Sequence, residues 1–189
     1  MCPPRLIGLC GRMGSGKDTT AELLAPYGYK RLAFADPLKQ EVADCIQDER
    51  FPEDIPLDLF EVMLTSRPRD AWKKPTPDGM RKLLQWYGTD FRRNQDSEYW
   101  IKKAESSIRD GKYVFSDVRF PNEASLIRKH GGQIWRIVRD VEDNGIPGHV
   151  SELIDGIEYD RKILNTGPLE SLEMKLAGIM QMYQVLRCA

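Results

Sequence analysis

A glycine-rich loop constrains this chain more than any other feature, and it runs Gly11-Arg12-Met13-Gly14-Ser15-Gly16-Lys17-Asp18-Thr19. It follows an apolar run at residues 6–10 and precedes a helical pattern at residues 20–24. Two glycines five apart and a lysine, between a strand and a helix, are typical of loops that cradle nucleotide phosphates. The glycines let successive N–H groups face anionic oxygens, and the lysine can reach the outer phosphates as a point charge. The sequence therefore predicts a nucleotide-binding site.

The residue after the lysine departs from the usual pattern. A serine or threonine normally stands there and its hydroxyl holds Mg²⁺, whereas this chain has Asp18. A bare carboxylate would repel phosphates, but carboxylate oxygen is a good ligand for Mg²⁺. Asp18 therefore indicates a metal ion between itself and the phosphates. A chance glycine-rich turn is the alternative, and the agreement of strand, spacing and helix argues against it.

Composition limits the remaining possibilities. A length of 189 residues, with 41% hydrophobic and 30% charged residues, suits one globular domain with a substantial core. The net charge of −1 argues against a nucleic-acid polymer as partner, because such a partner requires a basic surplus. The four cysteines show no paired spacing and are expected to be reduced. Neither a signal peptide nor a membrane-length apolar stretch is recognisable, so we expect a cytoplasmic protein without a membrane partner.

Strand and helix patterns alternate along the chain. Strands are expected at residues 5–10, 29–34, 112–116, 133–138 and 162–164, and helices at 20–24, 37–47, 80–87, 100–108, 121–131 and 169–186. Residues 48–76 hold several prolines and are expected to be the least regular part. This order predicts an α/β fold with a parallel sheet that is covered on both faces. Ligands then bind beyond the carboxyl ends of the strands.

Polar residues follow several of these strands. Asp36, Asp117 and Asn165 each come soon after a predicted strand, so they share one rim with the glycine-rich loop. An acid at the position of Asp117 is suited to orient Mg²⁺, although it could instead cap the following helix. Arg119, two residues later, could grip a phosphate with its planar guanidinium or lie solvated in a loop.

Three further groups are candidates for ligand contact. Residues 83–94 combine an amide, a carboxylate, two arginines and aromatic rings, which could bind a base and a phosphate or form part of the core. A basic patch that includes Arg69 lies in the proline-rich region and could equally be a solvated loop. Arg136, Arg139 and Arg161 flank residues 140–160, where a mobile flap could bring positive charge to a phosphoryl group. Each of these arginines could also be an exposed residue at a strand end.

Four runs of sequence carry a family resemblance. They are the glycine-rich loop, Phe34-Ala35-Asp36-Pro37-Leu38-Lys39, Leu84-Gln85-Trp86-Tyr87-Gly88-Thr89-Asp90 and Asp117-Val118-Arg119-Phe120-Pro121-Asn122-Glu123. With them the chain closely resembles bacteriophage-type deoxynucleoside monophosphate kinases, from Leu6 to the final helix. The resemblance implies a single P-loop NTPase domain over 1–189, with an adenylate-kinase-like five-stranded parallel sheet flanked by helices. It further implies a monophosphate-binding region at 36–107 and a short lid-like segment at 140–160.

The resemblance also implies an activity, the Mg²⁺-assisted transfer of a phosphoryl group from ATP to a deoxynucleoside monophosphate. The implied catalytic residues are Lys17, Asp117, Arg119 and Arg139, with Asp18 and Asp117 at the metal. ATP would contact Gly11, Met13, Gly14, Ser15, Gly16, Lys17, Asp18, Thr19, Asn165 and Gly167, the last two in a turn beside the base. The monophosphate would contact Asp36, Lys39, Arg69, Gln85, Thr89, Asp90, Arg93, Trp100, Arg119, Asn122 and Glu123.

Two other functions remain open on the sequence. A kinase of another small phosphate acceptor, such as phosphomevalonate or a coenzyme precursor, would share the loop and Asp117-Val118-Arg119 but would not need residues 85–90. A nucleotide-dependent switch protein would use the loop for binding alone. The partners expected are nucleotides, in the host cytoplasm if the chain is phage-encoded. A homodimer through residues 48–76 or the final helix is also open.

Overall fold

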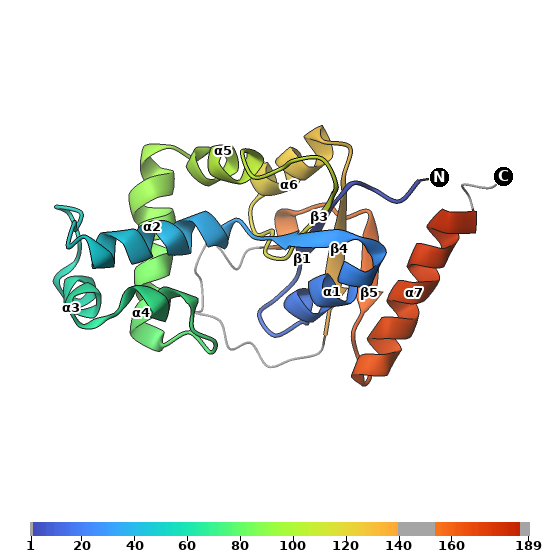
Figure 1. The fold of residues 1–189 in the computed structure, drawn as a ribbon, viewed down its shortest axis with the longest axis horizontal. Coiled ribbons are helices and arrows are strands. Elements are labelled where there is room, and N and C mark those ends of the chain that lie inside the picture. Colours follow the sequence, from blue (N-terminus) through green and yellow to red (C-terminus); the bar gives the residue numbers. More distant parts are fainter. Residues whose placement is uncertain (1, 140–153, 186–189) are drawn as a thin grey trace. The chain divides into compact units, whose positions relative to one another are not determined.

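The computed structural model describes residues 2–139 and 154–185, and these group into two compact units. Unit 1 comprises Met1–Ala33 and Glu105–Ala189, and unit 2 comprises Phe34–Ala104 (Figure 1). Each unit has a hydrophobic core of its own, so each is described by itself. The boundaries of unit 2 lie close to those of the expected monophosphate-binding region at 36–107. The role of that region stays a prediction.

Unit 1 is built on a five-stranded sheet in which all strands are parallel. The spatial order is β2 (Tyr29–Leu32), β3 (Lys112–Phe115), β1 (Leu6–Cys10), β4 (Gln133–Val138) and β5 (Arg161–Leu164). Strand β1 occupies the centre and all five of its residues are buried. A continuous apolar run is what a parallel strand covered on both faces requires. The α/β fold with a five-stranded parallel sheet is thereby confirmed.

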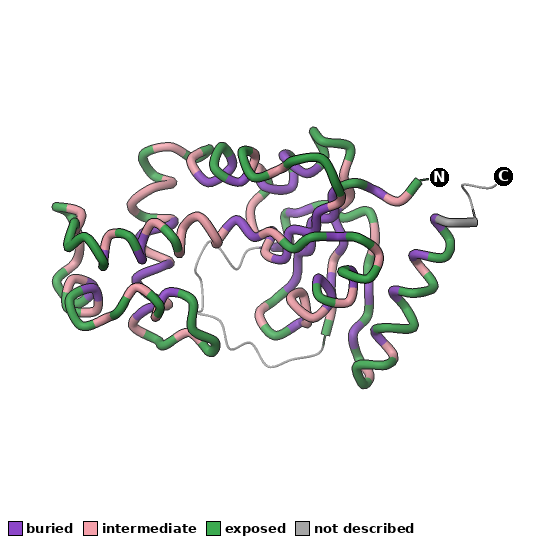
Figure 2. Tube along the Cα trace, in the orientation of Figure 1, coloured by how far each residue is buried: buried purple, intermediate pink, exposed green. Residues whose placement is uncertain are grey.

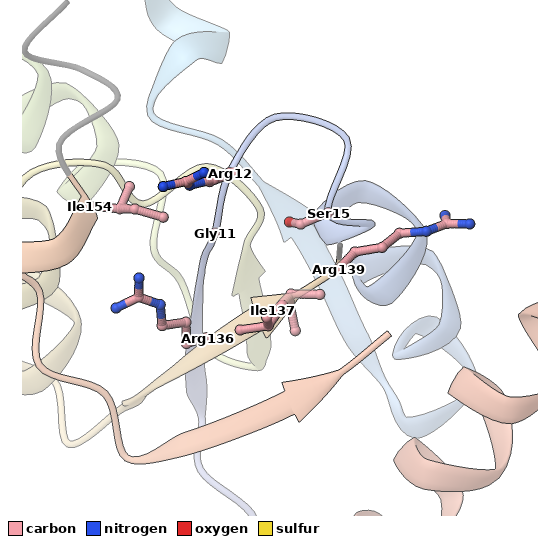
Figure 3. A pocket seen from close by; sticks show the side chains of 8 residues that line it. Gly11, Arg12, Ser15, Arg136, Ile137, Arg139 and Ile154 are labelled. Atoms are coloured by element: carbon pink, nitrogen blue, oxygen red, sulfur yellow. The ribbon is translucent and has the colours of Figure 1, made fainter. Parts of the chain in front are cut away.

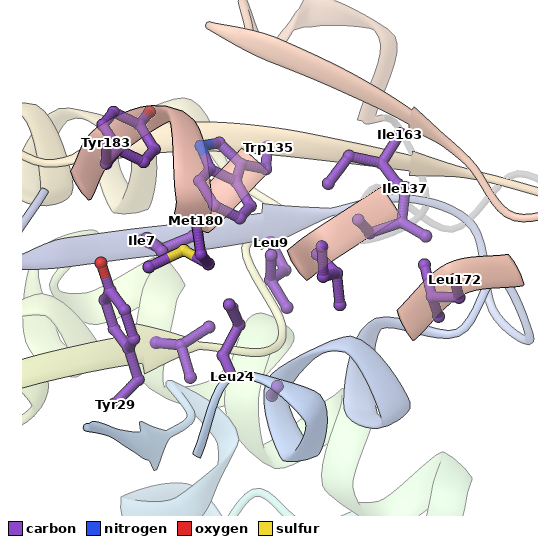
Figure 4. Close-up of a cluster of buried hydrophobic side chains, with 13 residues drawn as sticks. Ile7, Leu9, Leu24, Tyr29, Trp135, Ile137, Ile163, Leu172, Met180 and Tyr183 are labelled. Carbon is purple, nitrogen blue, oxygen red and sulfur yellow. The ribbon is translucent and has the colours of Figure 1, made fainter. Parts of the chain in front are cut away.

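Helices cover both faces of this sheet. On one face, α1 (Lys17–Leu23) and α7 (Leu169–Val185) pack on β1, β4 and β5 around Leu9, Trp135 and Leu172 (Figure 4). On the other face lies α6 (Pro121–Lys129). Gly8 of β1 makes its close approach possible, because a Cβ there would lie 3.2 Å from Cγ1 of Ile127 in α6. The apolar stripe of the last helix is therefore core packing, as its spacing predicts.

Unit 2 is entirely helical. It contains α2 (Ala35–Gln47), α3 (Leu57–Thr65), a 3₁₀ helix at Pro68–Trp72, α4 (Asp78–Gln85), a π-helical segment at Trp86–Arg93 and α5 (Tyr99–Glu105), which ends one residue beyond the unit. Its core gathers Val42, Met63, Leu83 and Tyr87 from different helices, and Figure 2 shows buried positions along these helices.

Residues 48–76 are more regular than the sequence suggests. Two of the prolines there mark the starts of helices, because Pro56 precedes α3 directly and Pro68 is the first residue of the 3₁₀ helix. Proline lacks the backbone N–H that the first turn leaves unpaired, and its fixed φ suits a helix start. The helix predicted at 80–87 is not one regular α-helix, because the chain changes from α- to π-helical geometry after Gln85.

Most of the lid-like segment predicted at 140–160 lies outside the described residues. Of its described part, Ile154–Gly156 forms a 3₁₀ turn, and Ile154 and Ile157 are buried. Among the helices of residues 2–139 and 154–185, none combines the length and the apolar character that a membrane span demands.

Candidate functional site

The glycine-rich loop takes a backbone shape that only glycine supports at several positions. Gly11, Gly14 and Gly16 have φ angles of 152°, 76° and 98°. These positive φ angles would strain the backbone of any residue that carries a Cβ atom. At Gly11 a Cβ would also meet the Ile137 carbonyl and would lie 2.7 Å from Oγ of Ser15. The loop joins β1 to α1 and forms a turn of the kind whose N–H groups hold anions.

The ammonium group of Lys17 lies across this loop. Its Nζ donates to the carbonyl oxygens of Gly11 and Arg12, at 2.7 Å in both cases. Ser15 is only 1% exposed, and its Oγ has no hydrogen-bond partner among the described residues. These features fit a bound polyphosphate. Its oxygens would accept hydrogen bonds from the Lys17 ammonium and from the Ser15 hydroxyl.

A pocket of about 260 Å³ lies between this loop and the end of β4 (Figure 3). Its polar lining comes from Arg12 and Ser15 of the loop and from Arg136 and Arg139. The guanidinium of Arg136 lies 5.7 Å from the ring of Tyr159. Three arginines around one pocket make it strongly attractive to anions. Arg161 is elsewhere, since its guanidinium lies against the rings of Trp135 and Tyr183.

The two predicted metal ligands both lie in unit 1. Asp18 lies in the first turn of α1, and its Oδ1 is 3.8 Å from Nε of Arg31. Asp117 is half-buried and follows β3. Within the described ranges, no three His, Cys, Asp or Glu side chains form a metal cluster. A bound ion would thus depend on phosphate and water oxygens besides these carboxylates, a mixture that Mg²⁺ accepts.

Residues 119–123 lead into the first turn of α6. Glu123 is 2% exposed, and its carboxylate accepts the backbone N–H groups of Arg119 at 2.7 Å and Phe120 at 3.1 Å. It therefore caps the start of α6, and its substrate contact stays a prediction. Arg119 and Asn122 are half-buried in the same turn.

Asn165 stands at the end of β5 and is tied to the glycine-rich loop. It is 6% exposed, and its Nδ2 donates to the carbonyl oxygen of Ser15 at 2.9 Å. Its backbone N–H donates to Val138 of β4. The structure thus gives Asn165 a loop contact that the sequence did not reveal. Gly167, two residues on, lies so near the start of α7 that a Cβ would be 3.1 Å from Cβ of Ser171.

The other predicted substrate contacts belong to unit 2. The exposed or half-buried ones are Asp36, Lys39, Arg69, Gln85, Thr89, Asp90 and Arg93. Lys39 lies 5.5 Å from the ring of Trp72. Trp100 differs from these, because it is 2% exposed and its indole N–H donates to the carbonyl of Gly88 at 2.8 Å. Trp100 is thus part of the core of unit 2, and its substrate contact stays a prediction.

A polar network in unit 2 escaped the sequence reasoning. The carboxylate of Glu41 accepts the hydroxyls of Tyr99 at 2.9 Å and Tyr87 at 3.1 Å, and it pairs with Arg92 and with Lys103. Arg92 also lies about 5 Å from the aromatic rings around it. The sequence interpretation left Arg92 open, as a phosphate contact or a solvated residue. The aromatic residues in 86–99 are the sequence feature that could have indicated the network. The acceptor of Arg92, however, is Glu41 on a different helix, α2.

The pKa of Glu41 responds to this environment. Burial alone would raise it, but hydrogen bonds from Tyr99 and Lys103 and the charge of Arg92 outweigh burial and lower the pKa. Tyr87 has its pKa raised, first by burial and then by Cys45 and Glu41. Glu41 is thus ionised and Tyr87 protonated over the physiological range, so the network is a fixed structural element.

Comparison with known proteins agrees with these features. The family model for deoxynucleotide monophosphate kinase matches residues 69–176. A protein of Acanthamoeba polyphaga mimivirus, named "Putative deoxynucleotide monophosphate kinase", is 32% identical over 185 residues, which cover 87% of this chain and 90% of that one.

Solved structures show the fold. A protein from Thermus thermophilus has a TM-score of 0.50 at 20% identity, with 96% of this chain and 98% of that chain covered. A dephospho-CoA kinase from Campylobacter jejuni has a TM-score of 0.47 at 13% identity, with 95% and 97% covered. The first of these supports the fold, and the family match identifies a phosphotransferase. The chain is a kinase that belongs to the deoxynucleotide monophosphate kinase family.

Proposed function

We propose that this protein transfers the γ-phosphoryl group of ATP, with Mg²⁺, to deoxynucleoside monophosphates and forms the diphosphates. The observation that carries the proposal is the shape of the glycine-rich loop, with the Lys17 ammonium on the Gly11 and Arg12 carbonyls, in a member of this family. That shape fits a triphosphate, and Mg²⁺ supplies charge neutralisation when it is bound.

The donor side of the reaction rests on residues of unit 1. Lys17 exchanges its loop carbonyls for phosphate oxygens and holds them, while the loop N–H groups orient the chain of phosphates. Asp18 and Asp117 are the proposed metal ligands. Arg139, which lines the pocket beside Ser15, is proposed to neutralise the charge that builds up on the migrating group.

The acceptor side needs positioning more than proton transfer. A monophosphate oxygen is already anionic near neutral pH, so no strong general base is required. Arg119 is the proposed grip on that phosphate, and Arg93 is a second one. The exposed or half-buried side chains at Asp36, Gln85, Thr89 and Asp90 are proposed to recognise the nucleoside.

The test is a coupled assay of ADP formation with a panel of acceptors. The panel holds the four deoxynucleoside monophosphates, the matching ribonucleotides, phosphomevalonate and dephospho-CoA. We expect deoxynucleoside monophosphates to stimulate ADP formation far above the rate without acceptor, and Lys17→Ala to lose that stimulation. Stimulation by phosphomevalonate or dephospho-CoA alone would identify another small-molecule kinase. Slow hydrolysis that no acceptor stimulates would point to a switch protein.

A further inference from the structure

The glycine-rich loop contains one peptide group whose orientation depends on a side chain from the other end of the sequence. The carbonyl oxygen of Ser15 accepts Nδ2 of Asn165 at 2.9 Å, across a separation of 150 residues. Asn165 is itself held by its backbone N–H, which donates to Val138 at 2.7 Å. The donor is therefore fixed on the edge strand β5 and on its neighbour β4, and the acceptor is in the loop.

A peptide group is planar, so its carbonyl and its N–H point in opposite directions. Fixing the Ser15 carbonyl on Asn165 turns the N–H of Gly16 to the opposite side of the loop. Gly16 has a φ of 98°, and a glycine can rotate such a peptide group at little cost. The loop therefore needs a restraint from outside if this N–H is to keep one direction.

The contact is close as well as directional. Asn165 is 6% exposed, and a methyl group on Gly16 would collide with its amide nitrogen. One of the two N–H groups on this nitrogen donates to Ser15, which ties the amide to the loop. Because Asn165 is buried, little of its side chain is accessible to a nucleotide base.

We propose that Asn165 is a positioning residue that holds the Ser15–Gly16 peptide group in the orientation that binds the donor phosphates. It acts on the phosphates through the loop and makes no contact with the base. The inference rests on the proposed function, because it assumes that the loop binds a nucleoside triphosphate.

Calorimetry with two ligands separates the two roles of Asn165. Mg·ATP carries a base and magnesium tripolyphosphate carries none. In Asn165→Ala we expect the dissociation constants of both ligands to rise by the same factor, roughly three- to tenfold, as for the loss of one buried hydrogen bond. The KM for ATP should rise with it, while kcat at saturating ATP changes less.

Lys175→Ala is the matched control. The ammonium group of Lys175 donates to the carbonyl oxygen of Leu164 at 2.6 Å. Leu164 directly precedes Asn165 and is not part of the glycine-rich loop. Lys175→Ala deletes a similar side chain-to-backbone bond at the same end of β5, and both dissociation constants should stay within twofold of the wild type, as expected for an exposed contact.

A second variant covers the case in which alanine at this position impairs folding. Asn165→Leu keeps most of the side-chain volume and has no donor. In protein labelled with ¹⁵N-glycine, the Gly16 amide should give one sharp signal in the wild type and a broadened or split one in Asn165→Leu, because the peptide group then samples two orientations.

Three results would overturn the inference but not the proposed function. The first is weaker Mg·ATP binding by Asn165→Ala with unchanged tripolyphosphate binding, which would mean a base contact. The others are unchanged binding of both ligands by Asn165→Ala and an unchanged Gly16 signal in Asn165→Leu. A wild-type protein that bound neither ligand would contradict the proposed function, and the inference with it.

Discussion

At the scale of single residues, Lys17 can be removed with little structural cost. Its two hydrogen bonds go to loop carbonyls at a partly exposed site, so Lys17→Ala should leave the melting temperature nearly unchanged. The loss of its charge at the phosphates should lower kcat at least a hundredfold, about 3 kcal/mol of barrier. Turnover of the purified variant at saturating substrates measures this. Lys30→Ala, on the exposed part of β2, is the control, and normal turnover by Lys17→Ala would remove the loop from the mechanism.

Asp18 calls for a metal titration. Asp18→Ala should raise the Mg²⁺ concentration that gives half-maximal activity by roughly tenfold, because a carboxylate ligand is lost. Asp18→Thr should restore part of the affinity through its hydroxyl. The measurement is activity against free Mg²⁺ for the wild type and both variants. Three superimposable curves would show that Asp18 is not near the ion.

Arg119 should separate acceptor from donor. Its backbone is held by Glu123, so the position of the guanidinium depends on a fixed turn. Arg119→Ala should raise the KM for the monophosphate by roughly a hundredfold, with a much smaller change for ATP, because one charge-assisted contact to the acceptor is lost. Arg128→Ala, on the helix α6 that follows Arg119, is the control, since Arg128 donates to the carbonyl oxygen of Glu158 on an exposed surface. Equal losses for both substrates would place Arg119 elsewhere.

At the scale of elements, the Glu41 network ties three helical segments of unit 2 together. The carboxylate of Glu41 in α2 accepts hydrogen bonds from Tyr87 and Arg92 of the π-helical segment and from Tyr99 and Lys103 of α5. Four donors on one half-buried carboxylate are a strong restraint, because each loses its partner if the segment moves. The network therefore holds residues 86–93 in a geometry that the local sequence alone does not favour.

Glu41→Gln should lower the stability of unit 2 by about 2 kcal/mol at pH 7, since bonds to a charged acceptor are weakened. The pKa of Glu41 is lowered from its ordinary 4.5. The unfolded state therefore binds the proton first as pH falls. The stabilisation is complete above about pH 4.5, declines below it, and is lost once the pH falls below the folded pKa. Urea unfolding of both proteins from pH 7 to pH 3 should show their difference shrink.

Asp48→Asn is the control for this series. Asp48 forms an ion pair with Arg50 at an exposed position after α2, and such pairs contribute less than about 0.5 kcal/mol. A Glu41→Gln difference that stayed constant from pH 7 to pH 3 would show that the charge of Glu41 is not what stabilises the network.

The inner strands β1, β3 and β4 could be predicted from the sequence because each is a short, mainly apolar run between turn signals. The pattern at 133–138 gave the bounds of β4 correctly, and 112–116 missed those of β3 by one residue. The π-helical segment could not be predicted from a local pattern, and its residue Tyr87 donates to Glu41, more than forty residues earlier. The prolines in 48–76 predict irregular structure, but proline is also compatible with the start of a helix, where Pro56 and Pro68 stand.

The candidate site divides in the same way. The glycines of the loop follow a local spacing rule, and they take the conformations that this rule demands. The roles of Glu123 and Asn165 depend on which backbone group each side chain reaches in the folded chain. For Asn165 that group lies 150 residues away, beyond any local pattern. Trp100 was chosen for its size alone, and size does not distinguish a core residue from a ligand contact.

At the scale of the whole molecule, the two cores are separate sets of residues. The core of unit 1 joins strands to α1 and α7, and the core of unit 2 joins α2, α3, α4 and α5 with the π-helical segment. The chain enters unit 2 at Phe34 and leaves it at Ala104. A unit with its own core and only two chain connections is able to open without the other, as cooperative subunits of a structure do.

Two matched core variants test this independence. Leu83 in unit 2 and Leu24 in unit 1 are both fully buried, and leucine-to-alanine changes in cores cost about 2–5 kcal/mol. Leu83→Ala should speed the exchange of protected amides in Phe34–Ala104 while those of β1 and β4 keep their rates. Leu24→Ala should do the reverse. Hydrogen exchange followed by mass spectrometry measures both, and equal acceleration in both units by either variant would mean that the chain opens as one cooperative body.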